Sequence, residues 1–221
     1  MARKKSELVS AHYMSARIIE RLANAVIDLG GSDDDLHRID LEEGLAEKLA
    51  TMLMNGPKPE FKTWRMIKLG TGLRTADDFR SAHKRADMKI GDYANDMLGK
   101  SAFTASETEQ QVELVVASVA ELGFKKGARF DQICGRAREL GLELCPNEVG
   151  PQLRLQYTDQ PMNEWLLVAM EPIFDSDGYR SGWRVGRGGG GLWLDGTGVC
   201  FHPGSVWDHD DRFVFVRRKS R

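Results

Sequence analysis

The spacing of apolar residues at the start of the chain predicts two amphipathic helices. In residues 6–29 apolar side chains recur at helical spacing until Gly30 and Gly31 end the pattern. Ser32 and three aspartates then form an acidic helix start, and a second apolar stripe predicts one helix that continues to Leu53. Two helices cannot bury both stripes alone. We therefore expect this N-terminal helical region, residues 1–56, to pack on the rest of the chain or to form a homo-oligomer.

A small α+β unit is predicted over residues 57–110, after a short linker with two prolines. Residues 61–69 are rich in β-forming side chains and predict a strand. Thr75 and Asp78 fit a helix capping box, and residues 90–98 suit a second short helix. Nothing in this segment points to a particular chemistry.

The largest domain is predicted over residues 111–221. Alternating apolar residues in 112–119 predict a strand, and the apolar face of residues 130–140 predicts a helix that ends at Gly141. Further short strands are predicted at 153–157, 165–170, 183–185, 192–194 and 212–216. The complete pattern predicts an α+β protein in three parts.

Composition narrows the functional classes without naming one. The formal net charge of -2 in 221 residues gives no overall attraction for nucleic acid or an anionic membrane. No apolar run reaches membrane-spanning length, so no membrane partner is predicted. Cys134, Cys145 and Cys200 are odd in number and match no zinc spacing, which favours a reducing compartment. We expect a cytoplasmic protein.

The last quarter of the chain has an unusual composition. Between Glu171 and Lys219 there is no Lys, Glu, Gln or Met, whereas Gly, Trp, Arg, Asp and His are frequent. Rings, short side chains and guanidinium groups supply contact area and hydrogen bonds at low entropic cost. This segment is therefore predicted to be a recognition surface, with aromatic anchors and hydrogen-bonding Arg and His side chains. The predicted ligand-binding residues are Tyr179, Arg180, Trp183, Arg184, Arg187, Thr197, Phe201, His202, Ser205 and His209.

For some aromatic side chains of this segment a core position is the alternative to a surface position, because successive residues of a strand face opposite sides. The aromatic residues for which a core position is the alternative are Trp183, Trp193, Trp207, Phe213 and Phe215.

The order of motifs in residues 112–221 resembles the C-type-lectin-like fold, which formylglycine-generating-enzyme-like domains share. The motifs are the helix over 130–140, Leu144-Cys145-Pro146-Asn147-Glu148, Arg187-Gly188-Gly189 and the closing strand over 213–217. Within this group the chain looks most like the variable proteins of diversity-generating retroelements, whose final segment is rewritten at adenines. Such rewriting of asparagine codons that end in a pyrimidine never yields Lys, Glu, Gln, Met or Trp. The segment between Glu171 and Lys219 matches this pattern if Trp183, Trp193 and Trp207 belong to the unvaried scaffold.

The resemblance implies a non-enzymatic protein that presents a diversified face to a protein or other surface ligand of unknown identity. A nucleic-acid-associated regulatory protein is the first alternative, since Arg and aromatic side chains also stack on bases. The aspartates of the same segment dilute its positive charge and favour a protein ligand. A metal- or thiol-dependent enzyme built on Cys200, His202 and residues 208–211 is the third reading, but their spacing fits no metal motif. No catalytic residue, metal or cofactor is predicted.

Overall fold

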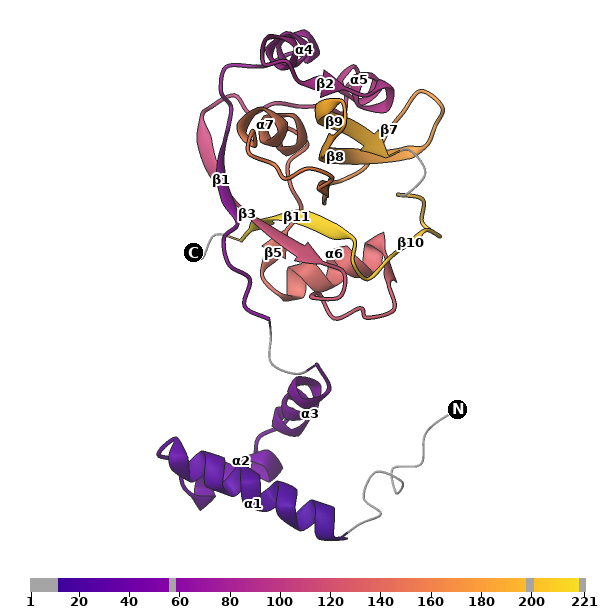
Figure 1. The fold of residues 1–221 in the computed structure, drawn as a ribbon. Coiled ribbons are helices and arrows are strands. Elements are labelled where there is room, and N and C mark those ends of the chain that lie inside the picture. The colour runs from indigo at the N-terminus through magenta and orange to yellow at the C-terminus, as the bar shows by residue number, and fades with distance from the viewer. Residues whose placement is uncertain (1–11, 56–58, 198–200, 219–221) are drawn as a thin grey trace. The chain divides into compact units, whose positions relative to one another are not determined.

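The computed structural model describes residues 12–55, 59–197 and 201–218 (Figure 1). The chain has the predicted α+β class. It divides into two compact units, Met1–Pro57 and Lys58–Arg221. The predicted boundary between residues 110 and 111 lies inside the second unit, because β1 (Arg65–Leu69) pairs with β3 (Gln110–Ser118).

Three helices make up the described part of the first unit: α1 (His12–Asp28), α2 (Asp33–Leu41) and α3 (Leu45–Asn55). The single long second helix predicted here is wrong, because the chain turns at Gly44, whose φ of 78° lies in the left-handed region. Asp35 accepts a hydrogen bond from the Ser32 backbone N–H at 2.9 Å, so the predicted helix start is correct.

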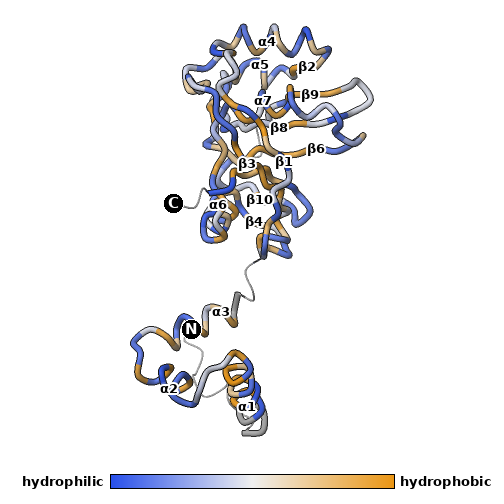
Figure 2. The backbone as a smooth tube through the Cα atoms, turned by 90° about the vertical axis from the view of Figure 1, so that its left-hand side faces the viewer, coloured by the Kyte–Doolittle hydropathy of each residue, from blue (hydrophilic) through white to orange (hydrophobic). Residues whose placement is uncertain are grey.

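Apolar and polar residues are mixed along the helices of this unit (Figure 2). No side chain described in residues 17–53 is buried. The large apolar side chains left exposed are Ile18, Ile19, Leu22, Ile27, Leu29, Leu41, Met52 and Leu53. By itself, the described part of this unit therefore has no hydrophobic core.

A mixed sheet with the strand order β1-β3-β11-β6-β8-β9-β2 forms the centre of the second unit. Its remaining strands are β2 (Lys89–Ile90), β6 (Trp165–Val168), β8 (Arg180–Gly188), β9 (Gly191–Thr197) and β11 (Arg212–Arg217). The pairs β11–β6 and β2–β9 are parallel, and the other pairs along this path are antiparallel. Off the path, β5 (Leu142–Glu143) pairs with β11 and β7 (Ile173–Phe174) pairs with β8. A separate pair consists of β4 (Ala128–Arg129) and β10 (Val206–Trp207).

Helices cover both faces of this sheet (Figure 1). On one face, α4 (Ala76–Arg85), α5 (Asp92–Leu98) and α7 (Val149–Gln156) pack on a core that includes Trp183 and Val214. On the other, α6 (Phe130–Glu139) packs on β3, β11 and β6. This second core reaches β8 at Gly182, which the Phe201 ring contacts, but it includes no described residue of β8 or β9 themselves. One side of these two strands is therefore available for a binding site.

Most of the local signals in the sequence are confirmed. Thr75 and Asp78 form the capping box of α4, and Gly141 follows α6 with a φ of 82°. The strand predicted at 153–157 is wrong, because Leu153 lies in α7 and is fully buried one turn after Val149. Pro151 is tolerated in α7 since it lies in the first turn, where an N–H has no helical partner.

Candidate ligand-binding site

Trp183 belongs to the face of β8 that is turned toward the first core. Its side chain is fully buried, its ring lies against Gly150, and its Nε1 donates a hydrogen bond to the Asn147 carbonyl oxygen at 2.6 Å. Trp183 is therefore a core residue, which corrects its prediction as an exposed anchor. Arg187 is on the same face, is partly buried, and donates through Nη1 to the Gln160 carbonyl oxygen at 2.9 Å.

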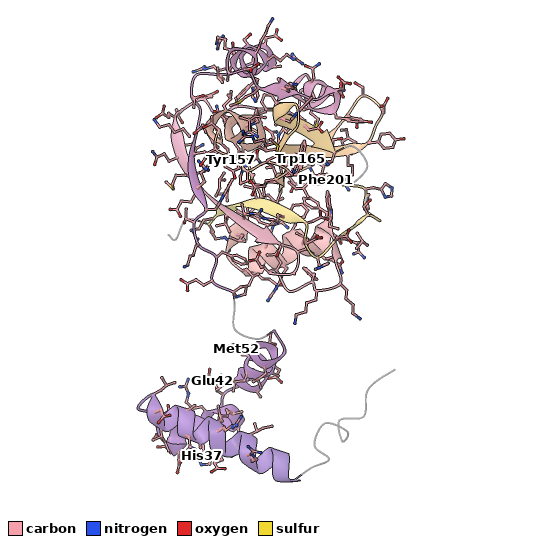
Figure 3. The ribbon with its side chains drawn as sticks, in the orientation of Figure 1. His37, Glu42, Met52, Tyr157, Trp165 and Phe201 are labelled. Atoms are coloured by element: carbon pink, nitrogen blue, oxygen red, sulfur yellow. The ribbon has the colours of Figure 1, made fainter. Side chains whose placement is uncertain are left out.

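The opposite face of β8 presents Gly182, Arg184 and Gly186. The ring of Trp165 lies against Gly186, where a Cβ atom would come within 2.1 Å of the ring. The Arg184 guanidinium carbon lies 4.2 Å from the centroid of the same ring, in a cation–π contact. Trp165 lies on this side of β8 because its ring contacts Gly186, and Phe201 lies there because its ring contacts Gly182. Both side chains are labelled in Figure 3. The missing side chain at Gly186 thus makes room for Trp165, and Trp165 supports Arg184.

Around Arg184 there is a pocket of about 560 Å³, here called the Arg184 pocket. It is lined by residues of β6, β8, β9 and the segment 205–212. Three predicted residues, Arg184, Thr197 and Ser205, line it together. Its volume falls in the range of small-molecule sites, about 300–1,000 Å³.

Three polar atoms of the residues that line this pocket are buried without a partner in the described part of the chain. They are Arg184 Nε, Thr197 Oγ1 and Trp207 Nε1. The Thr197 and Trp207 side chains are almost fully enclosed, with 8% and 6% of their surface exposed. Each unpaired buried polar group costs about 1–3 kcal/mol. Two of these groups, the Arg184 guanidinium and the Trp207 indole N–H, can only donate, whereas the Thr197 hydroxyl can donate or accept.

Arg184 differs from the other partly or fully buried arginines of the second unit in its hydrogen bonding. Every other described arginine of this unit that is partly or fully buried donates at least one hydrogen bond: Arg65, Arg80, Arg136, Arg154, Arg187 and Arg217. Within residues 59–197 and 201–218, the Arg184 guanidinium has no hydrogen-bond acceptor and no ion-pair partner. A partly buried cation in this state is available to a ligand.

Three carboxylates line another part of the same pocket, those of Asp208, Asp210 and Asp211. Burial raises the pKa of Asp211, and the charges of Asp208 and Asp210 raise it further, whereas a hydrogen bond from the Asp208 backbone N–H lowers it. Arg212 does not neutralise this group, because its guanidinium is paired with Glu164 at 2.8 Å. The pocket therefore combines one unpaired cation with an acidic wall.

A second pocket of about 700 Å³ lies between α6 and residues 201–204. Arg180, Phe201 and His202 line it. Phe201 is only 2% exposed, and its ring centroid lies 5.4 Å from that of Trp207. The prediction of Phe201 as an exposed anchor is therefore corrected: its buried ring lines this second pocket and packs on Trp207, which lines the Arg184 pocket.

Tyr179 and His209 are exposed and line neither of these two pockets, and the same holds for the partly buried Arg187. Tyr179 follows a turn in which the Asp175 carboxylate accepts hydrogen bonds from the backbone N–H groups of Asp177 and Tyr179. The structure thus brings six of the ten predicted residues to two neighbouring pockets. Trp165 was not predicted as a site residue, since its position depends on the pairing of β6 with β8.

Thiol and metal chemistry find no support in the described residues. Burial raises the pKa of Cys134 to about 12, and Cys145 is fully enclosed. Cys200 lies outside the described residues. Within the described ranges, His, Cys, Asp and Glu side chains form no group of three that could hold a metal ion. None of the helices described there has the length and apolar character needed to span a bilayer.

No family model matches this chain, and neither a curated protein nor a solved structure matches it. The resemblance to C-type-lectin-like proteins therefore rests on the sequence motifs alone.

Proposed function

We propose that this chain is a non-enzymatic ligand-binding protein that holds its ligand on the open side of β8 and β9. The observation that carries the proposal is the Arg184 guanidinium, which is partly buried over Trp165 and has no acceptor among the described residues. A ligand that supplies an acceptor would offset the cost of burying this cation. Thr197 and Ser205 line the same pocket, and Arg180 and His202 line its neighbour.

We further propose that this face is the diversified surface of a retroelement variable protein. The residues of the Arg184 pocket that come from the last quarter of the chain include Arg184, Thr197 and Ser205. Of the three tryptophans that this reading requires to be unvaried, Trp183 and Trp207 are buried and Trp193 is partly buried. Exchange of exposed side chains around a buried scaffold would change the ligand without loss of the fold.

The genetic part of the proposal is tested in the DNA around the gene. We expect a near-copy of the codons for residues 178–212, which differs mainly at adenines and lies near a reverse transcriptase gene. If natural isolates show no such copy and no adenine-biased variation in these codons, the retroelement reading is wrong. The ligand-binding proposal would then stand by itself.

The binding part is tested with peptides selected from a displayed random library on the full chain. Their affinities for Arg184→Ala and His202→Ala are then measured by calorimetry. We expect loss of about tenfold or more in affinity in at least one of these variants, as for a lost charge-assisted hydrogen bond. Arg85→Ala is the matched control, since Arg85 is exposed on α4, which packs on the other face of the sheet. Unchanged affinities in both variants would refute the proposed face.

Nucleic acid is a second candidate ligand, because Arg184 over Trp165 would also suit a stacked base. Three aspartates line the same pocket and would repel phosphates, so we favour a protein or other surface ligand. Titration with a single-stranded oligonucleotide separates the two candidates. Tight binding that weakens steeply with salt would favour nucleic acid.

Two further expectations concern the setting of the protein. The free thiols of Cys134 and Cys145 are consistent with the cytoplasm as its compartment. The exposed apolar side chains of α1 to α3 favour self-association of the N-terminal unit.

A further inference from the structure

We infer that the Arg184 pocket recognises an amino-acid-like zwitterion, a ligand with a carboxylate and an ammonium group on the same carbon atom. This inference rests on the proposed ligand-binding function and adds the chemistry of the ligand. Three features of the pocket carry it: unpaired donors, an acidic wall and two apolar side chains.

The unpaired donors call for acceptor atoms. Arg184, Thr197 and Trp207 together carry guanidinium N–H groups, a hydroxyl and an indole N–H. Arg184 Nε, Thr197 Oγ1 and Trp207 Nε1 have no hydrogen-bond partner among the described residues. Trp207 Nε1 can only donate, and the guanidinium can only donate. A carboxylate matches this set because its two oxygens accept several hydrogen bonds and carry the charge that Arg184 lacks.

The acidic wall calls for a cation. Asp208, Asp210 and Asp211 line the pocket, and Arg212 is already engaged by Glu164. Burial and the nearby charges of Asp208 and Asp210 raise the pKa of Asp211 despite its hydrogen bond from the Asp208 N–H, so they disfavour its charged form. An ammonium group of the ligand would supply a compensating charge and would favour ionised Asp211.

Two apolar side chains add to the lining of the same pocket. Trp165 and Leu167 line the pocket, and Gly186 leaves room for the Trp165 ring. The pocket of about 560 Å³ has space for an apolar side chain as well as the charged groups.

Ligands with only one charge fit this arrangement less well. A simple anion would face Asp208, Asp210 and Asp211, and a simple cation would face Arg184. Arg184 and Asp211 are partly buried, so a like charge beside either of them is repelled more strongly than in open solvent, and each singly charged ligand loses at one wall part of what it gains at the other. Only a ligand with both charges satisfies both walls.

The test uses the full chain and four probes with one side chain: L-phenylalanine, N-acetyl-L-phenylalanine, L-phenylalaninamide and N-acetyl-L-phenylalaninamide. The corresponding leucine series is the second set. Binding is followed by NMR through the indole N–H signals, which report on Trp165 and Trp207 directly. We expect the free amino acid of at least one series to bind about tenfold more tightly than its N-acetyl and amide forms, as for loss of one charged contact.

Two variants assign this binding to the pocket. Arg184→Ala should weaken the free amino acid about tenfold while the amide form gains, and Asp211→Asn should weaken the free amino acid while the N-acetyl form gains. Arg85→Ala should change nothing. If Arg184→Ala does not fold, as judged by circular dichroism, Thr197→Val removes one donor of the pocket with little change in shape and should still weaken the free amino acid.

The outcomes separate this inference from the proposed function. If neither free amino acid binds, or if an amide form binds equally well, the zwitterion is wrong. Peptides selected from the library that still depend on Arg184 or His202 would then preserve the proposed function. If neither the probes nor the peptides depend on these residues, both conclusions fall.

Discussion

Thr197 lies directly opposite Gly182 in the β8–β9 pair, and its hydroxyl oxygen has no hydrogen-bond partner in residues 59–197 and 201–218. Valine has nearly the shape of threonine without the hydroxyl group. We therefore expect Thr197→Val to leave the free energy of unfolding unchanged or to raise it by up to about 1 kcal/mol. Urea denaturation of the ligand-free protein measures this. In the matched control, Thr75→Val removes the N-cap of α4 and should cost about 1 kcal/mol. A comparable loss in Thr197→Val would mean that its hydroxyl is paired.

A Cβ atom at Gly186 would overlap the Trp165 ring, whereas one at Gly188 would meet no atom within 4 Å. We expect Gly186→Ala to lower the free energy of unfolding by about 1–3 kcal/mol, as in other overpacked sites. It should also weaken ligand binding, because Arg184 rests on the displaced ring. Gly188→Ala lies on the same strand and face and should be neutral in both measurements. Equal effects of the two substitutions would contradict the assigned role of Gly186.

The burial of His83 predicts that the free energy of unfolding depends on pH. The side chain is fully buried, and this burial lowers its pKa below 6.5. The unfolded chain therefore binds a proton at a pH where the folded chain does not, so stability is complete above about pH 6.5 and falls as the pH is lowered. The slope should reach up to about 1.4 kcal/mol per pH unit in this window. His83→Leu should remove this part of the slope in thermal unfolding between pH 5 and 7, and His209→Gln, at an exposed site, should retain it.

The buried cysteines should be chemically inert in the folded protein. Burial raises the pKa of Cys134 to about 12, so almost no thiolate is present near neutral pH. Cys145 is also buried, and its Sγ lies 3.4 Å from the Val214 carbonyl oxygen. We expect iodoacetamide at pH 8 to modify neither residue until urea unfolds the chain, as measured by mass spectrometry. Rapid modification of Cys134 in the native state would reopen the thiol-enzyme alternative.

The N-terminal unit should associate with a second copy of itself. No side chain described in residues 17–53 is buried, and α2 and α3, with 9 and 11 residues, have a length at which isolated helices are only marginally stable. We expect sedimentation equilibrium to show a mass that rises with concentration. Ile18→Glu with Leu22→Glu should abolish this rise, because both exposed side chains lie on one face of α1. Arg21→Glu changes a charge on the same helix and should have little effect. A concentration-independent monomer would exclude self-association.

Local patterns in the sequence were sufficient for much of the fold. The capping box at Thr75, the helix that ends before Gly141 and the strand over residues 112–119 are all present. Each depends on contacts within a few residues, so each leaves a readable periodicity. The extent of α7 was mispredicted because Leu153, Leu155 and Tyr157 also have the period of a strand, and only packing against the first core distinguishes a helix from a strand there.

By itself, the sequence established the α+β class, many of the elements and a segment rich in recognition-type side chains. Only the tertiary structure decided which of those side chains meet. Trp183 and Arg184 are neighbours in sequence, yet one lies in the core and the other lines a pocket, because adjacent strand residues face opposite sides. Likewise, Trp165 reaches Arg184 through the pairing of β6 with β8. Such long-range register depends on the complete sheet, which no local pattern records.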